Sequence, residues 1–457
     1  MLMPTPLQII FAFLTALYRI GGFLLSLWWI YCPLILFFLA KGLWLKAARQ
    51  KFIQRIDWLI LEIKPPAEIK KTPRAMEQFF AGLHGTQRTP NWKERNIGGE
   101  VQEWFSLEMV SQSGEIHFLI RLPKMYRDLV EAQIYAQYPE TEIEQVSDYV
   151  QSVPVDMANS DYDLWGTELV LTKEDAYPIR TYTAFEKDIL LEEQRIDPVA
   201  SLLEVMSKLK EGENIWIQTL VRPVMSEWRK SCEKLRDKIL NRAVARAPGE
   251  LKKEALAWKD ESRNQLHFLL AGPSSTSPAV EERKINPLDW MTKSEKDVLT
   301  ALEENINKIA FEIIIRFVYS APSDIFSKSN VSAVIGCYKQ FSTENLNGFK
   351  PNKKVTPKID YRVQLKKPRE NYRKRKILAA YRKREFIQYS TAIPYLKTFF
   401  FERLPILNWF FIRSQPFVFN IEELATVYHY PGEMVKAPLT PKVEAKKGEP
   451  PMRLPVK

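Results

Sequence analysis

The sequence predicts an α+β protein: an N-terminal transmembrane helix, two ferredoxin-like (βαββαβ) units, the second with a helical insertion, and an extended C-terminal tail. Three observations lead to this prediction. A long apolar run lies near the N-terminus, strand and helix patterns follow one another twice in the order β-α-β-β-α-β, and residues 437–457 are rich in Pro and Lys. The expected domain boundaries are 1–55, 56–150, 160–360 with an insertion at about 225–309, 361–419 and 420–457.

The apolar run is the first expected element. From Ile20 to Leu45 the only charged residue is Lys41, and about 20 apolar residues suffice to cross a bilayer. The alternatives are a buried core helix and a cleaved signal peptide, although a signal peptide would have a shorter apolar run. Basic residues follow the run, so the positive-inside rule places the rest of the chain in the cytoplasm. We therefore expect a single-pass inner-membrane protein, in which Leu7–Tyr18 either lies at the interface or forms part of a second membrane segment.

The first βαββαβ unit follows the basic residues. Its expected elements are a strand at Trp58–Ile63, a helix at Thr72–Gly85, strands at Val101–Val110 and Glu115–Arg121, a helix at Pro123–Tyr138 and a strand at Ile143–Val146. Ser113 and Gly114 suit a two-residue hairpin turn between the two central strands. That turn sets a register in which Met109 faces Phe118, with one apolar face throughout.

We interpret the following block as a second unit of the same plan. Its expected elements are strands at Thr167–Leu171, Ile179–Thr183, Asn214–Val221 and Phe311–Tyr319 and helices at Pro198–Leu209 and Val331–Phe341. The charged, mostly helical stretch Met225–Ile309 separates the two central strands. We interpret it as an insertion that opens the central hairpin of this unit.

The residues that commonly carry catalysis form no motif in this sequence. Three cysteines are widely spaced with no CxxC, and the four histidines form no pair with metal-ligand spacing. No Gly-Lys dipeptide occurs, so a Walker loop is absent, and neither GxSxG nor HExxH is found. We therefore expect no enzymatic activity, no cofactor and no metal.

The net charge of +11 is concentrated in one segment. From Arg362 to Glu385 there are eleven Lys or Arg residues and two Glu residues, and apolar residues at helical spacing predict a helix. Such a run is either a solvated helix face or a site for DNA or anionic lipid. The candidate polyanion-binding residues are Arg369, Arg373, Lys374, Arg375, Lys376, Arg382, Lys383 and Arg384.

The segment Pro416–Pro438, PFVFNIEELATVYHYPGEMVKAP, resembles the region just before the motor domain of conjugative-transfer ATPases. These are the TraG-like and HerA/FtsK-type proteins of type IV secretion. Leu61–Gly85 and Gln340–Pro351 are also similar to that pre-ATPase region. No motor domain follows in this sequence, so the resemblance carries over no catalytic residue.

The resemblance implies a membrane-anchored, non-catalytic adaptor subunit of a DNA-transfer machine that docks a separate HerA/FtsK-type ATPase. The residues expected to dock this partner lie in 420–457, with Glu422, Glu423, Leu424, Tyr428, His429 and Pro431 as candidates. DNA, anionic lipid and further copies of the chain in a homo-oligomer are the other expected partners. The alternative function is a membrane-tethered scaffold that binds anionic lipid and has no nucleic-acid role.

Overall fold

The computed structural model describes residues 28–66, 71–152, 161–187, 197–225, 228–246, 291–358, 366–386 and 414–432, together with Thr15, Ser26 and Ile69. The described residues fall into two compact units. One is drawn from the ranges Met1–Ile56 and Thr89–Val101, and the other from Asp57–Arg88, Gln102–Ile387 and Ile412–Lys457. Each unit is described by itself below.

The smaller unit contains helix α2 (Trp28–Arg55) and the short π-helix η1 (Glu94–Gly98). η1 ends at Gly99, whose φ of 72° lies in the left-handed region. A Cβ at this position would lie 2.5 Å from the backbone of Ala48, so only glycine fits where η1 meets α2.

The expected N-terminal transmembrane helix is wrong for this structure. In the part of the chain that the structure describes, no helix has the length and apolar character needed to cross a membrane. The apolar residues occupy only part of α2, which runs on as one helix through Lys46, Arg49, Lys51 and Arg55. Leu7–Tyr18, apart from Thr15, lies outside the described residues. The expected location at the inner membrane is untested and stays a prediction.

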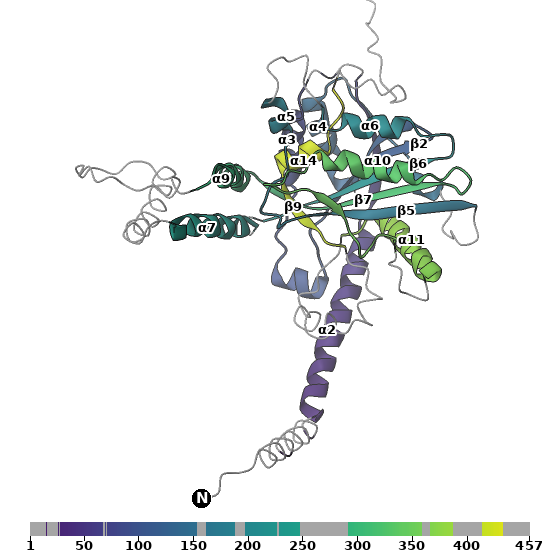
Figure 1. The fold of residues 1–457 in the computed structure, drawn as a ribbon. Helices are drawn as coiled ribbons and strands as arrows, with labels where there is room; N and C mark the ends of the chain where they lie inside the picture. Colours follow the sequence, from purple (N-terminus) through teal and green to yellow (C-terminus); the bar gives the residue numbers. More distant parts are fainter. Residues whose placement is uncertain are drawn as a thin grey trace, which may run out of the picture. The chain divides into compact units, whose positions relative to one another are not determined.

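In the larger unit, nine described strands form one antiparallel sheet (Figure 1). The strands are β1 (Trp58–Lys64), β2 (Phe105–Gln112), β3 (Glu115–Pro123), β4 (Glu142–Gln145), β5 (Tyr162–Leu171), β6 (Asn214–Pro223), β7 (Ala310–Pro322), β8 (Phe349–Pro351) and β9 (Phe417–Asn420). Their order across the sheet is β4-β1-β3-β2-β6-β7-β5-β8, and β9 pairs with β7.

The strand order contains the same arrangement twice. The order β4-β1-β3-β2, with helices α3 (Arg74–His84) and α4 (Arg127–Gln137), is that of a split βαβ unit. The order β8-β5-β7-β6, with helices α6 (Ala200–Ser207) and α10 (Lys328–Lys339), repeats it. The two copies are not separate domains, because β2 pairs with β6 from Phe105↔Val221 to Gln112↔Asn214. This edge-to-edge pairing joins the expected units into one sheet.

The helical insertion lies between β6 and β7, as expected. It contains α7 (Arg229–Arg246) and α9 (Lys293–Ile306), which lie side by side in Figure 1. Cys232, Leu235 and Ile239 of α7 share a small core with the apolar residues of α9. The sequence AGPSSTSP at Ala271–Pro278 predicts a flexible loop within the insertion, and it lies outside the described residues.

The strand expected at Ile179–Thr183 does not form. Helix α5 (Tyr182–Lys187) begins there instead. The backbone N–H of Ile179 donates to the carboxylate of Glu423 at 2.9 Å rather than to a neighbouring strand. A side chain from far along the chain therefore decides the local structure, which no local pattern could indicate.

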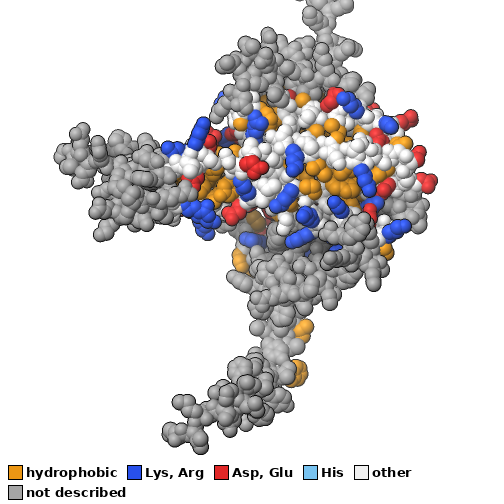
Figure 2. All heavy atoms as spheres, in the orientation of Figure 1, with side chains coloured by type: hydrophobic (Ala, Val, Ile, Leu, Met, Phe, Trp, Pro, Cys, Tyr) orange, Lys and Arg blue, Asp and Glu red, His pale blue; other side chains and the backbone are white. Residues whose placement is uncertain are grey.

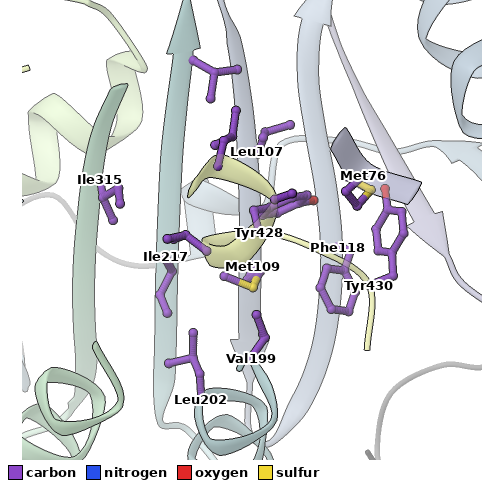
Figure 3. Close-up of a cluster of buried hydrophobic side chains, with 14 of the residues drawn as sticks. Met76, Leu107, Met109, Phe118, Val199, Leu202, Ile217, Ile315, Tyr428 and Tyr430 are labelled. Carbon is purple, nitrogen blue, oxygen red and sulfur yellow. The ribbon is translucent and has the colours of Figure 1, made fainter. Parts of the chain in front are cut away.

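One face of the sheet carries the main hydrophobic core, under α3, α4, α5, α6, α10 and α14 (Ile421–Val427). The pairing of Met109 with Phe118 confirms the predicted hairpin register. Ser113 and Gly114 have φ values of 54° and 92°, as a type I′ turn requires. Figure 3 shows Met109 and Phe118 lying beside Tyr428, so the hairpin packs against the segment that ends the described chain.

Replacing Phe118 by Ala is expected to lower the free energy of unfolding by about 3–5 kcal/mol, the usual cost of deleting a buried Phe ring. Phe118 is 1% exposed, and its ring centroid lies 5.4 Å from that of Tyr430. Urea denaturation would measure the change. The control is Glu115→Ala in the same hairpin, whose side chain is 60% exposed and whose loss should cost less than about 0.5 kcal/mol. Equal midpoints for the two variants would show that this core is not closed around Phe118.

Candidate nucleic-acid interface

The predicted basic helix is present as α11 (Lys366–Lys383). It packs on the second face of the sheet, where Ile377, Leu378 and Tyr381 join a core that includes Trp216. The helix also lies close to Gly166 of β5. A Cβ at Gly166 would lie 3.1 Å from Cγ1 of Ile377, so the missing side chain makes room for the helix.

A row of buried polar side chains crosses the sheet beneath the end of α11. Glu108, Gln218, Arg316 and Glu168 occupy directly paired positions on β2, β6, β7 and β5, and none is more than 2% exposed. Arg316 donates from Nε to Glu168 Oε1 at 3.0 Å and from Nη1 to Gln218 Oε1 at 3.1 Å. Gln218 Nε2 donates to Glu108 Oε1 at 3.0 Å. The row therefore supplies hydrogen-bond partners to its own buried members.

The same row holds the C-terminal end of α11. Arg316 Nη1 donates to the carbonyl oxygen of Ala380 at 3.2 Å, and Gln218 Nε2 donates to that of Tyr381 at 3.1 Å. The last four carbonyl groups of a helix have no partner within the helix. The backbone N–H of Arg384 donates to these two carbonyl oxygens at 3.3 and 3.2 Å, and the donors from the sheet add a further bond to each, which fixes the helix on this face.

Arg384 follows α11 in the left-handed conformation, with φ of 49°, and turns its side chain under the helix. Its guanidinium donates to both oxygens of Glu108, at 2.6 and 3.0 Å, and to both oxygens of Asp148, at 2.8 and 3.0 Å. Burial disfavours the Glu108 carboxylate, but the charge and hydrogen bonds of Arg384 hold its pKa below the usual value. Arg384 is thus a structural cation that is 1% exposed.

Several predicted polyanion-binding residues are therefore engaged inside the chain. Besides Arg384, Lys374 pairs with Asp163 at 2.5 Å, and Arg373 Nη1 donates to three backbone carbonyls. Arg369 and Arg382 are half-buried, and each has interactions of its own. Arg373, Lys374 and Arg384 thus have partners within the fold, and a role for them in binding a polyanion stays a prediction.

Arg375, Lys376 and Lys383 remain exposed on the solvent side of α11. Tyr372 lies on the same side, is 40% exposed, and has its ring centroid 5.7 Å from Nζ of Lys376. The buried residues Ile377, Leu378 and Tyr381 define the opposite side, as helical spacing requires. α11 thus separates an internal apolar side from an outer side with free cations.

Three further lysines were missed by the sequence reasoning. Lys353, Lys354 and Lys358 are exposed in the loop after β8. Arg373 Nη1 holds this loop beside α11 by donating to the carbonyl oxygens of Lys353 at 3.3 Å, Thr356 at 2.7 Å and Lys358 at 3.0 Å. The signal was a run of four lysines and no acidic residue in 350–358.

The basic surface is the name used below for Arg375, Lys376, Lys383, Lys353, Lys354 and Lys358. Over the face of the molecule in Figure 2, Lys and Arg side chains are spread among acidic and hydrophobic ones. The hydrogen bonds of Arg373 bring the lysines of the loop after β8 beside α11, and this places the cations of both segments on one surface. In the described residues, no group of His, Cys, Asp and Glu side chains could hold a metal ion.

The predicted docking residues are all buried within their own chain. β9 pairs with β7, and Asn420 then caps α14 in a capping box with Glu423. The buried residues are Glu422, Glu423, Leu424, Tyr428, His429 and Pro431. In this structure these side chains complete the core of their own chain, and their role in docking a partner stays a prediction.

Polar contacts fix this segment in the core. His429 bonds through Nε2 to Asp197 Oδ1 at 2.9 Å and through Nδ1 to the carbonyl oxygen of Ala425 at 2.8 Å. Glu423 accepts from the backbone N–H of Ile179 and of Asn420. Burial nevertheless raises the pKa of Glu423 to about 8.

The comparison with protein families covers nearly all of this architecture. A family model described as a domain of unknown function, DUF8128, matches residues 45–440. The chain therefore belongs to the DUF8128 family. A search of curated proteins found no match. The matched range includes the described sheet, α7 and α9 of the insertion, α11 and α14.

The buried carboxyl of Glu423 is expected to give the fold a pH dependence. Its pKa in the folded protein, about 8, lies above the ordinary value of 4.5, because burial favours the neutral carboxyl. The stability that the neutral carboxyl contributes is therefore fully present below pH 4.5 and is lost as the pH rises to about 8. Between these pH values the wild-type free energy of unfolding should fall relative to Glu423→Gln by up to roughly 1.4 kcal/mol per pH unit. Thermal unfolding across this range measures the slope.

Glu422→Gln is the matched control for this pH dependence. Burial disfavours the Glu422 carboxylate, but hydrogen bonds from Lys308 and Thr183 hold its pKa below 4.5, so it titrates outside the window. Parallel stability curves for wild type and Glu423→Gln across the window would contradict the expectation.

Proposed function

We propose that this protein is a non-catalytic adaptor subunit of a conjugative DNA-transfer machine, which binds nucleic acid through the basic surface and works with a separate HerA/FtsK-type ATPase. The observation that carries the proposal is the basic surface itself. Its cations belong to two segments that Arg373 holds together by three hydrogen bonds. The resemblance of Pro416–Pro438 to the pre-ATPase region connects this surface with DNA transfer.

The chemistry of the basic surface fits a single-stranded nucleic acid. Exposed Lys and Arg side chains neutralise phosphates, and an exposed aromatic ring gives a base a flat surface for stacking. Tyr372 provides such a ring beside Arg375 and Lys376. Lysines from the loop after β8 widen the cationic area beyond a single helix. No sequence preference is implied, because stacking and phosphate contacts accept every base.

Anionic lipid is the competing ligand. A helix that lies in a membrane interface exposes a broad apolar side toward the acyl chains. α11 instead buries Ile377, Leu378 and Tyr381 against the sheet. The side that it exposes carries charge and one tyrosine, which favours a hydrated phosphate backbone over insertion between lipids.

Replacing Arg375, Lys376, Lys353 and Lys354 with Gln is expected to weaken binding to single-stranded DNA. Each lost phosphate contact should reduce the slope of log K against log salt concentration by about 0.7. Fluorescence anisotropy with a labelled oligonucleotide over a salt series measures both affinity and slope, and anionic vesicles form a second arm.

The matched control replaces Lys208, Lys210, Lys328 and Lys339 with Gln, which removes the same charge from exposed positions on and near α6 and α10. Unchanged DNA affinity and slope in the basic-surface variant would overturn the proposal. Loss of vesicle binding alone would favour the lipid scaffold.

The partner ATPase is expected to depend on residues after Gly432, which lie outside the described residues. A chain ending at Gly432 keeps β9 and α14 in the core, so it tests docking without removing the segment that completes the fold. The full chain should co-purify with the ATPase, and the shortened chain should lose it. Equal recovery of the ATPase with both chains, each showing the same thermal unfolding, would remove this segment from the proposal.

A further inference from the structure

A second row of cations lies on helix α7, in the insertion between β6 and β7. Lys230, Lys234, Lys238 and Arg242 follow one another at intervals of four residues, and all are exposed. Residues four apart are neighbours on a helix surface, so these side chains form a continuous ridge. The α7 ridge is the name used below for these residues.

Among the described residues, none uses a ridge cation to hold the fold together. α7 is held by Cys232, Leu235 and Ile239, which pack with Val298 and other apolar residues of α9. Among the residues that the structure describes, no carboxylate forms an ion pair with a ridge cation. The acidic residues of α7 are half-buried, and Asp237 pairs with the neighbouring Arg236 at 3.4 Å. The ridge charges are therefore available to a ligand.

The spacing of the α7 ridge suits a phosphate backbone. Four residues advance about 6 Å along a helix, so the ridge extends over about 18 Å. Each strand of duplex DNA carries one phosphate per about 3.4 Å of its axis, so the ridge spans about five phosphates of one strand. Long lysine side chains can reach successive phosphates from such a row.

We infer that the α7 ridge is a second nucleic-acid contact, which binds the phosphate backbone of duplex DNA without reading its sequence. The inference rests on the proposed function and deepens it, because the basic surface of α11 with Tyr372 suits single strands. The ridge consists of four cations on long, flexible side chains, which suits it to phosphate contacts that position a duplex without specifying its sequence.

Other partners fit the α7 ridge less well. Protein interfaces are depleted in lysine and enriched in aromatic residues, whereas the described part of α7 exposes no large apolar side chain. A bilayer-bound helix needs an exposed apolar side, and that of α7 is buried against α9. Charge complementarity with a dense row of phosphates is the remaining match.

The test replaces Lys230, Lys234, Lys238 and Arg242 with Gln in the full chain. Gln retains high helix propensity, so α7 is expected to remain folded, as circular dichroism and thermal unfolding would check. Binding to a mixed-sequence duplex is measured by anisotropy over a salt series. The slope of log K against log salt concentration should fall by about 0.9 for each lost contact, or by about 3–4 for the whole ridge.

The α6 and α10 control variant, which removes four lysines elsewhere, should leave the duplex slope nearly unchanged. A ridge variant that binds duplex like this control would overturn the inference. If the basic-surface variant nevertheless shows weaker binding to single-stranded DNA, the proposed function stands without the ridge. Loss of duplex binding in the ridge variant alone, with no effect of the basic-surface variant on single strands, would support the ridge and remove the α11 site. The inference about the ridge would also be overturned by a ridge variant that loses binding to anionic vesicles but keeps its binding to duplex DNA.

Discussion

The buried guanidinium of Arg384 is the constraint on which the second face of the sheet depends. It connects Glu108 of β2 with Asp148, and its backbone carbonyl accepts a hydrogen bond from Trp104 Nε1 at 2.6 Å. Removing one partner from such a buried pair leaves an uncompensated charge, which typically costs about 3–5 kcal/mol. The exposed cations of α11 thus owe their position to a cation that is shielded from solvent, and α11 cannot slide along the sheet without breaking these bonds.

Local pattern accounts for strands β1 to β7 and for helices α3, α4, α6, α10 and α11, whereas the association of these elements required the structure. The alternation around Ser113-Gly114 determined the hairpin register, because a slip of one residue would bury its polar side. The pairing of β2 with β6 left no such trace: each strand alternates normally, and nothing marks these two as neighbours. The N-terminal run was misread for a related reason. Counting apolar residues ignored that α2 continues as one helix into charged sequence.

The candidate interface was predictable in charge but not in detail. Helical spacing places Ile377, Leu378 and Tyr381 inward and so leaves Arg375 and Lys376 outward, as the structure shows. The same spacing could not place Arg384, which lies past the helix end in a left-handed backbone. The lysines of the loop after β8 escaped notice because only hydrogen bonds to Arg373 bring them beside α11. A net charge cannot distinguish a cation that faces solvent from one, such as Arg384, that is buried in an ion pair.

The closure of the main core by β9 and α14 has a consequence for biosynthesis. β9 pairs with β7, and Tyr430 covers Phe118 near the other end of the domain. Neither contact can form before residues 417–430 have emerged from the ribosome, so until then part of the apolar face of the nascent sheet stays open. Contacts between residues so distant in sequence also slow folding. The protein should therefore depend on chaperones that shield the incomplete sheet until β9 and α14 have been synthesised.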